Sequence, residues 1–538
     1  MTVIKLLRLI LVISAIFVNF FPSVTGAEER RNYDFSDPSF LPPFSDRSDE
    51  TTFLVKKIEV SGNTVLNNEI GLLVSPYVNK YLSFEDLINL RTSITQVYIN
   101  KGYVTSGAFI VNNQDLSQGI IKIQVVEGDI ERIDLTGLQR LNQGYIRSRL
   151  QLGIQRPLNV NNLQSALQLL QLDPLVENIN AELTAGTAPG RNVLLVTVKE
   201  APAFHAGIGF DNYRPPSIGS EEGTIFIDHD NLLGFGDRFN GQYAIASGLN
   251  TYNVGYSIPI NPNNGTVSIS YDNGVTAITQ ARFREFNITS ESETLSFAFR
   301  QPIIRKPTEE FALGLTLDLR HSQTYLDGEP FSFSGETDDG AARITVIRFS
   351  QDWVKRQPTS VIALRSQFSF GVGSLGATIT DLGVDGRFFS WIGQFQWVQQ
   401  LYPGAILLMK LDTQLTPDRL LSMEQFSIGG IDTVRGYPQN QIVTDNGVIV
   451  SLEARFPLTS NPDTLQITPF LEAGTGWNNS SFNPDPSTIA GTGIGLRWLI
   501  TAGLQVRLDY GIPLLPFKRQ GDSFQENGFY FSIRYQPF

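Results

Sequence analysis

Residues 311–320, Phe-Ala-Leu-Gly-Leu-Thr-Leu-Asp-Leu-Arg, alternate between large apolar side chains and small or polar ones. Successive side chains of a β-strand point to opposite faces, so this stretch predicts a strand with one apolar and one polar face. The same alternation recurs at 295–300 and 504–510, and no helical period interrupts it between residues 201 and 538. The larger part of the chain is therefore predicted to be mainly β.

Turn residues separate the alternating segments, for example at 261–265 and 272–274. A soluble sandwich would turn the apolar faces inward, whereas a membrane barrel turns them to lipid. An aromatic last segment, 529–535, and aromatic residues at segment ends favour the barrel. The latter are Trp391, Trp397, Tyr402, Trp477 and Trp498. Roughly 340 residues, at roughly 20 per strand and turn, allow about 16 strands.

The composition favours a protein part of whose surface lies in a medium other than water. Charged residues make up 17% of the 538 residues, below the roughly 25% of soluble domains. The absence of Cys excludes disulfides, Cys-based metal sites and a cysteine nucleophile. The net charge of −12 argues against a nucleic-acid partner, because such a protein presents basic surface to phosphates.

The N-terminus has the features of an export signal. Lys5 and Arg8 precede an apolar run at 9–21 and a small-residue end at 24–26, which predicts a signal peptide over residues 1–26. The alternative is a membrane-anchoring helix, but the run is shorter than the ~20 residues that span a bilayer. Residues 27–52 are rich in Pro and polar residues and are predicted to be a linker.

Residues 53–200 contain an internal repeat. Ile-Glu-Val-Ser-Gly at 58–62 is echoed by Ile-Asp-Leu-Thr-Gly at 133–137, with a similar order of elements after each. Two tandem β-α-α-β-β modules, 53–128 and 129–200, are predicted, with a single α+β domain as the alternative. The expected elements are strand 53–60, helix 69–81, a helix opened by Ser83, strands 104–111 and 120–126, then a helix near 145–150, a helix opened by Asn159, and strands 179–183 and 193–198.

Several motifs together resemble one family, the outer-membrane transporters of two-partner secretion, also called haemolysin secretion/activation proteins. The motifs are Lys-Gly-Tyr-Val-Thr-Ser at 101–106, Asn-Gln-Asp-Leu-Ser-Gln-Gly at 113–119, Val-Val-Glu-Gly at 125–128, Leu-Asp-Pro at 172–174, Asp-Asn-Leu-Leu-Gly-Phe-Gly-Asp at 230–237 and Ile-Gly-Gly-Ile-Asp-Thr-Val-Arg-Gly-Tyr at 428–437. The resemblance implies a 16-stranded outer-membrane barrel over 201–538. It also implies that 53–128 and 129–200 are periplasmic POTRA domains.

The Val434-Arg435-Gly436-Tyr437 tetrapeptide is predicted to belong to a loop, around 426–440, that folds back into the barrel lumen. Neighbouring glycines permit the sharp turns that such a loop requires. They are Gly429, Gly430 and Gly436. The alternative is that the arginine is an ordinary lumen-facing residue of a polar pore.

The family resemblance also implies a partner for Arg435. An aromatic-x-acid-x-Gly strand of the family matches Phe-Leu-Glu-Ala-Gly at 470–474, so Glu472, with Gly474 of the same motif, is the expected partner. Glu stands where the family usually has Asp. The family often carries an N-terminal plug helix, but residues 27–52 lack the apolar helical period that would favour one.

No motif points to an enzyme, a cofactor or a metal. The chain lacks a Walker A loop, His-Glu-x-x-His and Gly-x-Ser-x-Gly, and its three His residues lie far apart in sequence. Asp228-His229-Asp230 could bind a metal or form a polar turn. Gly491-x-Gly493-x-Gly495 lies in an alternating strand, which favours small residues facing the lumen or a neighbouring strand over a nucleotide fingerprint.

The resemblance therefore implies a non-enzymatic secretion channel. Its POTRA domains would capture an unfolded exported partner, a large exoprotein of the filamentous haemagglutinin or haemolysin kind, and pass it through the pore without nucleotide hydrolysis. A single barrel in outer-membrane lipid would suffice, because a closed barrel has no edge that requires a second copy. The alternatives are an insertase that assembles other barrels and a diffusion porin.

Overall fold

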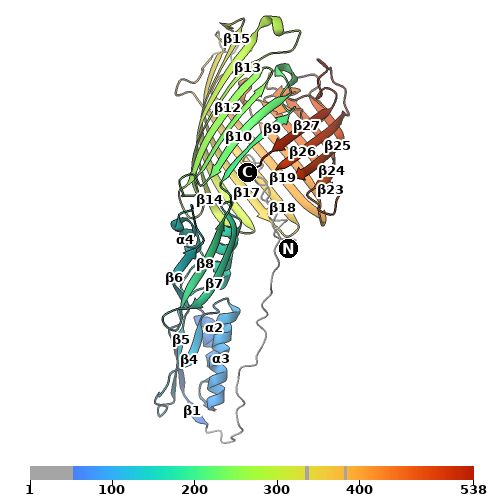
Figure 1. Ribbon diagram of the computed structural model, residues 1–538. Helices are drawn as coiled ribbons and strands as arrows, with labels where there is room; N and C mark the ends of the chain where they lie inside the picture. Colours follow the sequence, from blue (N-terminus) through green and yellow to red (C-terminus); the bar gives the residue numbers. More distant parts are fainter. Residues whose placement is uncertain (1–51, 334–338, 381–383, 481, 538) are drawn as a thin grey trace. The chain divides into compact units, whose positions relative to one another are not determined.

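A computed structural model describes residues 52–333, 339–380, 384–480 and 482–537. The predicted signal peptide and residues 27–51 of the predicted linker lie outside this range. The described residues divide into two compact units, one ending at Ala201 and one beginning at Pro202 (Figure 1). None of the helices in the described ranges is long and apolar enough to span a membrane.

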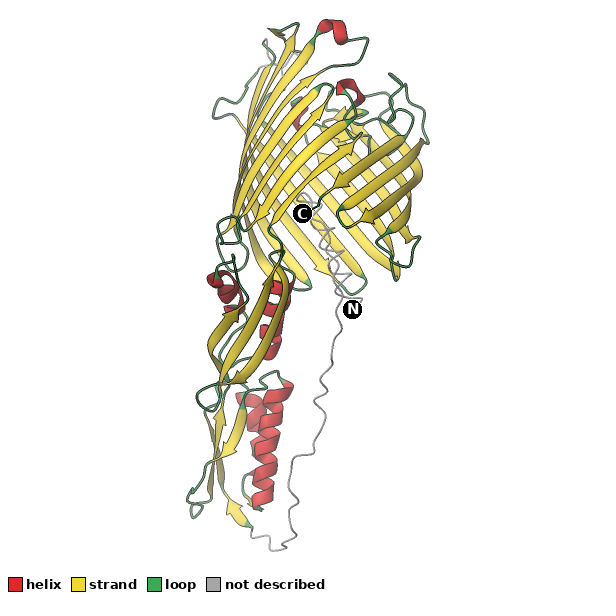
Figure 2. Cartoon of the chain, viewed as in Figure 1, coloured by secondary structure: helices red, strands yellow, loops and turns green. Residues whose placement is uncertain are grey.

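The first unit contains two modules, each with a three-stranded sheet and two helices (Figure 2). In the first module the sheet order is β2-β5-β4, and the core lies between this sheet and α3. The elements of the first module are β1 (Phe53–Val55), β2 (Lys57–Ser61), α2 (Asn67–Val74), η2 (Ser75–Tyr77), β3 (Lys80–Leu82), α3 (Phe84–Asn100), β4 (Gly107–Ile110) and β5 (Ile120–Val126).

The second module repeats this arrangement with sheet order β6-β8-β7. In both sheets the first strand pairs in parallel with the last strand and the middle strand pairs with it antiparallel. The elements of the second module are β6 (Asp129–Thr136), α4 (Gln143–Gln151), α5 (Val160–Gln171), β7 (Val176–Ala185) and β8 (Arg191–Glu200).

The start of α3 follows from its sequence. The Ser83 hydroxyl accepts from the Asp86 amide at 3.1 Å, and the Asp86 carboxylate accepts from the Ser83 amide at 2.8 Å, which forms a capping box. Apolar side chains three or four positions apart then form the buried face of the helix. The buried residues of this face are Leu87, Leu90, Ile94 and Tyr98.

The predicted helix over 69–81 is wrong in its second half. The helix α2 ends at Val74, because Pro76 and the left-handed Asn79 follow it. Tyr81 instead belongs to β3, which pairs with β1. The predicted strand 53–60 is consequently two strands, since its first residues pair with β3 and its last residues with β5.

A glutamate at the end of the last strand stabilises each module. The Glu127 carboxylate accepts from the amides of Thr64 and Val65 at 2.7 and 3.2 Å and from the Tyr98 hydroxyl at 2.9 Å. Glu200 does the same in the second module, where it accepts from the amides of residues 139–141. Each carboxylate thus holds the turn that follows the first strand of its module.

The charge of Glu127 makes the stability of the first module depend on pH. Burial raises the pKa of its carboxyl, but the hydrogen bonds from Thr64, Tyr98 and Val65 outweigh burial and hold the pKa below its ordinary value. The stabilisation is therefore complete above the ordinary glutamate pKa of about 4.3 and is lost as pH falls through the lowered pKa of the folded module.

Glu127→Gln is expected to destabilise the first module by about 1–3 kcal/mol at neutral pH, because the amide turns a donor towards groups that are themselves donors. Hydrogen exchange of the full chain, read at the amides of Thr64 and Val65, measures this loss. The difference from the parent chain should shrink as pH falls below about 4. Glu182→Gln, at an exposed position of β7, is the matched control. Equal exchange in the parent and in Glu127→Gln at pH 7 would contradict the assignment.

The second unit is a closed antiparallel barrel, as predicted (Figures 1 and 2). The described residues contain sixteen long strands, and β27 pairs with β9 to close the barrel. Two-residue β16 (Glu329–Pro330) extends the β15 hairpin. The long strands are β9 (Phe204–Asp211), β10 (Glu222–Asp230), β11 (Arg238–Ala246), β12 (Leu249–Pro259), β13 (Thr266–Ala277), β14 (Ile288–Lys306), β15 (Glu309–Leu326), β17 (Ala341–Arg356), β18 (Ser360–Val372), β19 (Phe388–Tyr402), β20 (Ala405–Leu415), β23 (Asn446–Pro457), β24 (Leu465–Trp477), β25 (Thr488–Thr501), β26 (Leu504–Pro513) and β27 (Phe529–Tyr535).

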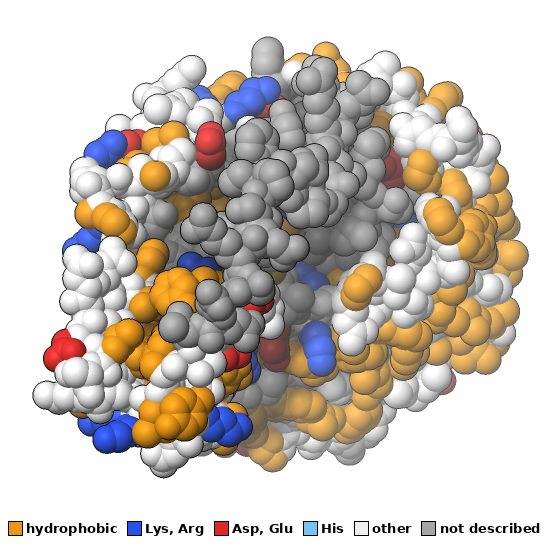
Figure 3. All heavy atoms as spheres, turned by 90° about the horizontal axis from the view of Figure 1, so that it is seen from below, with side chains coloured by type: hydrophobic (Ala, Val, Ile, Leu, Met, Phe, Trp, Pro, Cys, Tyr) orange, Lys and Arg blue, Asp and Glu red, His pale blue; other side chains and the backbone are white. Residues whose placement is uncertain are grey.

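The two faces of the barrel strands differ as the alternation predicted. In β15, Leu315 is 52% exposed on the outside, whereas Ala312 and Asp318 are 0% and 8% exposed on the lumen side. In β27, Phe529 and Ile533 are exposed and Tyr530 is buried. Hydrophobic side chains run along the right-hand outer edge of the space-filling view (Figure 3). The apolar face of the barrel is therefore the outer one, which confirms the prediction of a membrane barrel over that of a sandwich.

The predicted turn at 272–274 is wrong. These residues lie inside β13 and pair with residues of both neighbouring strands. Asp272 accepts a hydrogen bond of 2.6 Å from Asn253, its partner across the strand pair. Because the lumen face of this barrel is polar, it accommodates Asp and Gly residues that would end a strand in a soluble core.

Candidate functional site

A thirty-residue loop, 416–445, joins β20 to β23 and returns into the lumen. It contains a one-turn helix, η5 (Ser422–Glu424), and a short hairpin of β21 (Phe426–Ile428) and β22 (Ile442–Thr444). The tip of this lumen loop, between β21 and β22, carries the predicted tetrapeptide. Its side chains contact lumen-facing residues of β23, β24 and β26, so the loop lies against the inner wall.

Glycine at three positions lets the loop turn sharply. Gly429, Gly430 and Gly436 have φ of 112°, 100° and 99°, in the region that only glycine adopts readily. A side chain at Gly430 would also collide with Gln439 across the hairpin. The backbone conformation of the tip therefore depends on these residues.

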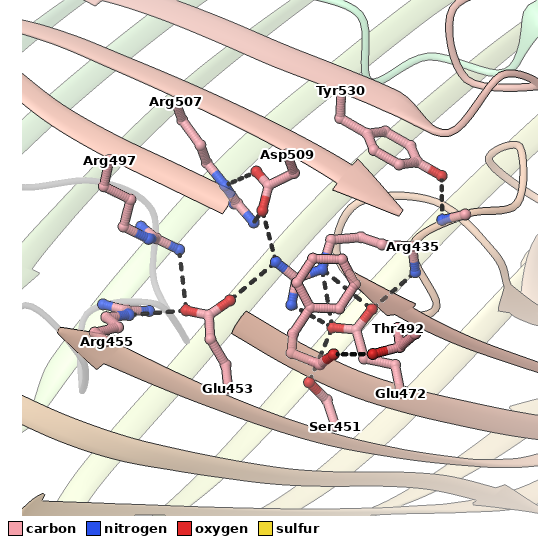
Figure 4. Close-up of polar contacts among 12 residues, drawn as sticks. Arg435, Ser451, Glu453, Arg455, Glu472, Thr492, Arg497, Arg507, Asp509 and Tyr530 are labelled. Carbon is pink, nitrogen blue, oxygen red and sulfur yellow. Dashed lines mark hydrogen bonds and ion pairs between the residues drawn. The ribbon is translucent and has the colours of Figure 1, made fainter. Parts of the chain in front are cut away.

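Arg435 lies at the centre of a cluster of carboxylates (Figure 4). Its Nη2 donates to Glu472 Oε1 at 2.6 Å, and its Nε lies 3.1 Å from both oxygens of that carboxylate. Its Nη1 donates to Asp509 Oδ1 at 2.7 Å and lies 2.9 Å from Glu453 Oε2. Three strands, β23, β24 and β26, thus each contribute one carboxylate to a single guanidinium.

The Arg435 site is buried and closely packed. Arg435 is 2% exposed, and its guanidinium carbon lies 3.5 Å from the centroid of the Phe470 ring. Its backbone amide also donates to Glu472 at 2.8 Å, and Ser451 donates to the same carboxylate at 3.0 Å. Removing one partner of such a buried pair leaves an uncompensated charge, at a cost of about 3–5 kcal/mol.

Three arginines of the barrel wall lie on the far side of the carboxylates (Figure 4). Arg455 and Arg497 approach Glu453 Oε1 at 2.8 and 3.5 Å, and Arg507 donates to Asp509 at 2.6 Å. Two of the three carboxylates therefore have a wall cation in addition to Arg435. Glu472 has no other cation among its contacts within the described residues.

Gly436 and Tyr437, which follow Arg435, bind the wall through backbone polar groups and through the Tyr437 hydroxyl. The Tyr530 hydroxyl of β27 accepts from the Gly436 amide at 3.0 Å and donates to the Tyr437 carbonyl at 2.6 Å. The Tyr437 hydroxyl lies 2.8 Å from the carbonyl oxygens of Ala490 and Leu515. The tip thus contacts β25, β27 and the connection between β26 and β27.

Val434 and Gly474 lie at an apolar contact between the loop and the wall and are not part of the ion cluster around Arg435. Val434 packs with Ile428 and Ile449, and all three are at least 97% buried. A β-carbon at Gly474 would lie 2.5 Å from Ile428 Cγ2 and 3.4 Å from Val434 Cγ2. Gly474 therefore makes room for the loop, whereas Glu472 alone of the predicted pair contacts Arg435.

The glycines of the Gly491-x-Gly493-x-Gly495 run also make room on the lumen face. A β-carbon at Gly491 would collide with the Arg435 carbonyl oxygen, and one at Gly493 would lie 2.5 Å from Cζ of Phe470. A β-carbon at Gly495 would meet Asp509 at 2.5 Å. The run thus lets the loop backbone and the ion cluster approach β25, as the lumen-facing interpretation predicted.

Asp228 and Asp230 are strand residues at the end of β10, and neither lies in a turn. Both form ion pairs with Arg238 of β11, at 3.2 and 3.4 Å. Across the described ranges, no group of three or more His, Cys, Asp or Glu side chains is arranged to hold a metal.

Reasoning from the sequence missed two of the three carboxylates around Arg435. Glu453 and Asp509 lie on the polar face of alternating segments, so their position in the lumen could be read from the pattern. Their contact with Arg435 could not, because it depends on how β23 and β26 are placed around the barrel.

Comparison with known families identifies both parts of the chain. Residues 190–498 match the family model of the haemolysin secretion/activation proteins ShlB/FhaC/HecB. Residues 53–128 match the POTRA domain of the ShlB type.

Similar proteins and structures agree with this match. The chain is 23% identical over 474 residues to the outer membrane transporter CdiB of Dickeya dadantii, with 83% of this chain and 81% of CdiB covered. It is 22% identical over 466 residues to the assembly factor BamA of Nitratidesulfovibrio vulgaris, but spans only 56% of that protein.

The solved structure of CdiB from Escherichia coli has the same fold, with a TM-score of 0.70, 23% identity and 93% of each chain covered. The family model matches more than half of the chain, which confirms the predicted family. The chain belongs to the haemolysin secretion/activation protein family and is an outer-membrane transporter of the two-partner secretion type, whose POTRA domains lie in the periplasm.

Proposed function

We propose that this transporter captures an unfolded exported partner with its POTRA domains and passes it through the barrel when the lumen loop moves. The observation that carries the proposal is the lumen loop, which lies against the inner wall and is held there by one buried arginine among three carboxylates. A loop held by ion pairs has a docked state and a released state that differ in a few contacts. Such a loop is suited to act as a gate.

The proposed domains are POTRA 1 at 53–128, POTRA 2 at 129–200 and the barrel at 201–538, with the gate around 426–440. The gate motif is Val434, Arg435, Gly436 and Tyr437, with Glu472 as the principal partner of the arginine. Gly474 serves the gate by leaving space for the loop.

Capture of the partner is proposed to occur at a strand edge. The strands β4 and β7 each pair on one side only among the described residues, so their outer backbone groups can accept an added strand. On β4, Phe109 is 50% exposed and offers an apolar contact beside that edge. An unfolded chain that adds to such an edge gains backbone hydrogen bonds irrespective of its sequence, and side-chain pockets then provide selectivity.

Deletion of residues 53–200 is expected to abolish binding of the partner's N-terminal segment. The proposed reason is that the edges of β4 and β7 are removed while the barrel, a separate compact unit, is left intact. Pull-down of that segment by the deleted chain and by the full chain measures the loss. Phe109→Ser in the full chain is a milder variant, and Phe333→Ser, at an exposed site of the barrel unit, is its control. If the chain without 53–200 binds the segment as well as the full chain, the capture model fails.

The proposed partner is a large exoprotein of the filamentous haemagglutinin or haemolysin kind. The proposed source of energy is the folding of that partner outside the cell, because the periplasm contains no ATP. A single chain, with its apolar face in outer-membrane lipid, is the proposed working unit, since its barrel is closed by β27 and β9.

The alternative is a barrel-assembly insertase, which the similarity to BamA brings into consideration. The chain covers about half of that BamA and about four-fifths of CdiB, which favours the transporter. Deletion of the gene for this protein distinguishes the transporter function from the insertase function. A transporter leaves the assembly of other outer-membrane barrels unchanged and stops export of one partner, whereas an insertase affects many barrels.

A further inference from the structure

The lumen loop has a second attachment to the wall, remote from Arg435 in the loop sequence. Glu424, the last residue of η5, accepts from Nη1 of Arg320 at 2.5 Å and from Nη2 and Nη1 of Arg348 at 2.8 and 3.0 Å. Arg320 also donates to the Met423 carbonyl at 2.6 Å. The Glu424 side chain is only 5% exposed, so the carboxylate is enclosed by its partners.

The wall that receives Glu424 is held in place by residues of four neighbouring strands. Arg348 of β17 donates to Asp318 of β15 at 2.6 Å and to Ser369 of β18 at 2.9 Å. Ser296 of β14 in turn donates to Asp318 at 2.7 Å. The guanidinium of Arg348 is therefore oriented by the wall, and it presents two N–H groups to the loop carboxylate in a bidentate contact.

The first part of the lumen loop, 416–425, has further attachments. Leu420 and Leu421 are 2% and 0% exposed and pack against residues of β17, Ala342, Ile344 and Val346. The Asp445 carboxylate accepts from the Leu420 amide at 3.0 Å and so joins the two ends of the loop. These contacts lie close to the root of the loop, where little chain separates them from β20.

The two attachments differ in the charge that the wall itself carries. At the Arg435 site, the wall contributes three carboxylates and three arginines, so its charges balance before the loop arrives. The wall residues are Glu453, Glu472 and Asp509 with Arg455, Arg497 and Arg507.

At the Glu424 site, the wall contributes two arginines and only one carboxylate, Asp318. Glu424 therefore neutralises a surplus positive charge that its departure would leave uncompensated. Departure of Arg435 leaves a wall without net charge, although Glu472 loses its cation, whereas departure of Glu424 leaves a net positive wall. Together with the buried Leu420 and Leu421, this surplus charge makes the root the more firmly held part of the loop.

We propose that Glu424 is a positioning residue that fixes the root of the lumen loop, so that movement of the loop is confined to residues 426–444 and hinges at Glu424. The proposal rests on the proposed gating function of the loop. Release of Arg435 then swings the tip away from the wall while residues 416–425 stay bound to β15 and β17. The loop returns to the same place, because its root has not moved.

Thiol labelling of the purified full chain tests the hinge, because the chain contains no Cys of its own. Leu421→Cys reports on the root and Val434→Cys on the tip, and both parent side chains are fully buried. Arg435→Ala is expected to raise the labelling rate of Cys at 434 by about tenfold or more and to leave that at 421 unchanged. Glu424→Gln is expected to raise the rate at 421 by about tenfold or more.

A double-mutant cycle shows whether the ion pair is the cause. Arg348→Gln should raise labelling at 421 less than Glu424→Gln does, because Arg320 still binds Glu424. The double variant should show less than the sum of the two effects, because both substitutions remove the Glu424–Arg348 pair. Asp463→Asn, at an exposed position of the connection between β23 and β24, is the control and should change neither rate. Insertion of each variant into the membrane as a folded barrel is checked by the change in its electrophoretic mobility on heating. If Glu424→Gln does not insert, Arg348→Gln alone carries the test.

Three results would overturn the proposal: equal acceleration at 421 and 434 in Arg435→Ala, unchanged labelling at 421 when the Glu424–Arg348 pair is removed, or additive effects in the cycle. None of these measurements involves an exported partner. Failure of the hinge therefore leaves the proposed secretion function standing. Conversely, absence of secretion does not alter the labelling result.

Discussion

A disulfide between residues 428 and 474 is expected to stop secretion of the exported partner, and reduction of that disulfide is expected to restore it. The parent chain has no Cys, so the chain with Ile428→Cys and Gly474→Cys contains one pair only. A β-carbon at Gly474 would lie 2.5 Å from Ile428 Cγ2, which is one bond from the Ile428 β-carbon. The two β-carbons therefore lie within about 4 Å of each other, which suits a disulfide, whose β-carbons are about 3.8 Å apart.

The expected effect is large because the bond joins the moving part of the loop to the wall. Ile428 is the last residue of β21, on the tip side of the proposed hinge, and Gly474 lies in β24, two residues after Glu472. A covalent link holds the docked state regardless of what happens at Arg435. Secretion should therefore fall to background under oxidising conditions.

Secretion is measured as the partner in the culture medium, with and without a membrane-permeant reductant. The Ile428→Cys chain and the reduced double variant are the controls and should both secrete, which separates the effect of the bond from that of the substitutions. Gly474→Cys alone is not a control, because its β-carbon would collide with the intact Ile428 side chain. Secretion by the oxidised double variant at the level of its reduced form would show that the loop does not have to move.

Arg435→Ala is expected to reduce secretion strongly while the barrel remains inserted and heat-modifiable. The substitution removes the only cation that Glu472 contacts in the described residues, and this carboxylate is 3% exposed. The docked state of the loop should lose about 3–5 kcal/mol, the cost of leaving one partner of a buried ion pair alone. The loop then no longer returns to its closed position, and the cycle of capture and release is interrupted.

The double variant Arg435→Met with Glu472→Gln separates charge from shape. It removes both charges and keeps side chains of similar size, so it should recover part of the docking that Arg435→Ala loses. Arg419→Ala, at an exposed position of the same loop, is the matched control and should secrete normally. Protease sensitivity of residues 426–444 reports the docking independently of secretion. Normal secretion by Arg435→Ala would remove the assigned role of this arginine.

Much of the fold could be predicted from local pattern alone. The alternation at 311–320 identified both faces of β15, because side chains of a strand alternate whatever the strand pairs with. Ser83 and Asp86 marked the start of α3, since a capping box involves only neighbouring residues. The export signal and the aromatic segment ends then favoured lipid over a sandwich core.

The errors occurred where a long-range partner overrode local preference. Residues 80 and 81 fall within the predicted helix but belong to β3, which pairs with β1 after Pro76 and Asn79 have ended α2. Asp272 and Gly274 signal a turn but extend β13, because the polar lumen gives Asp272 a hydrogen-bonding partner in Asn253. In both cases the deciding interaction joins residues that are distant in sequence.

The functional site divides in the same way. Neighbouring residues in the sequence were enough to assign Arg435 to a glycine-rich loop, and a family resemblance supplied Glu472. Only the tertiary structure brought Glu453 and Asp509 to the same guanidinium, and only it placed Glu424 against Arg320 and Arg348. The physical reason is that alternation fixes which face of a strand a residue occupies, whereas the register and closure of the barrel decide which residues meet across the lumen.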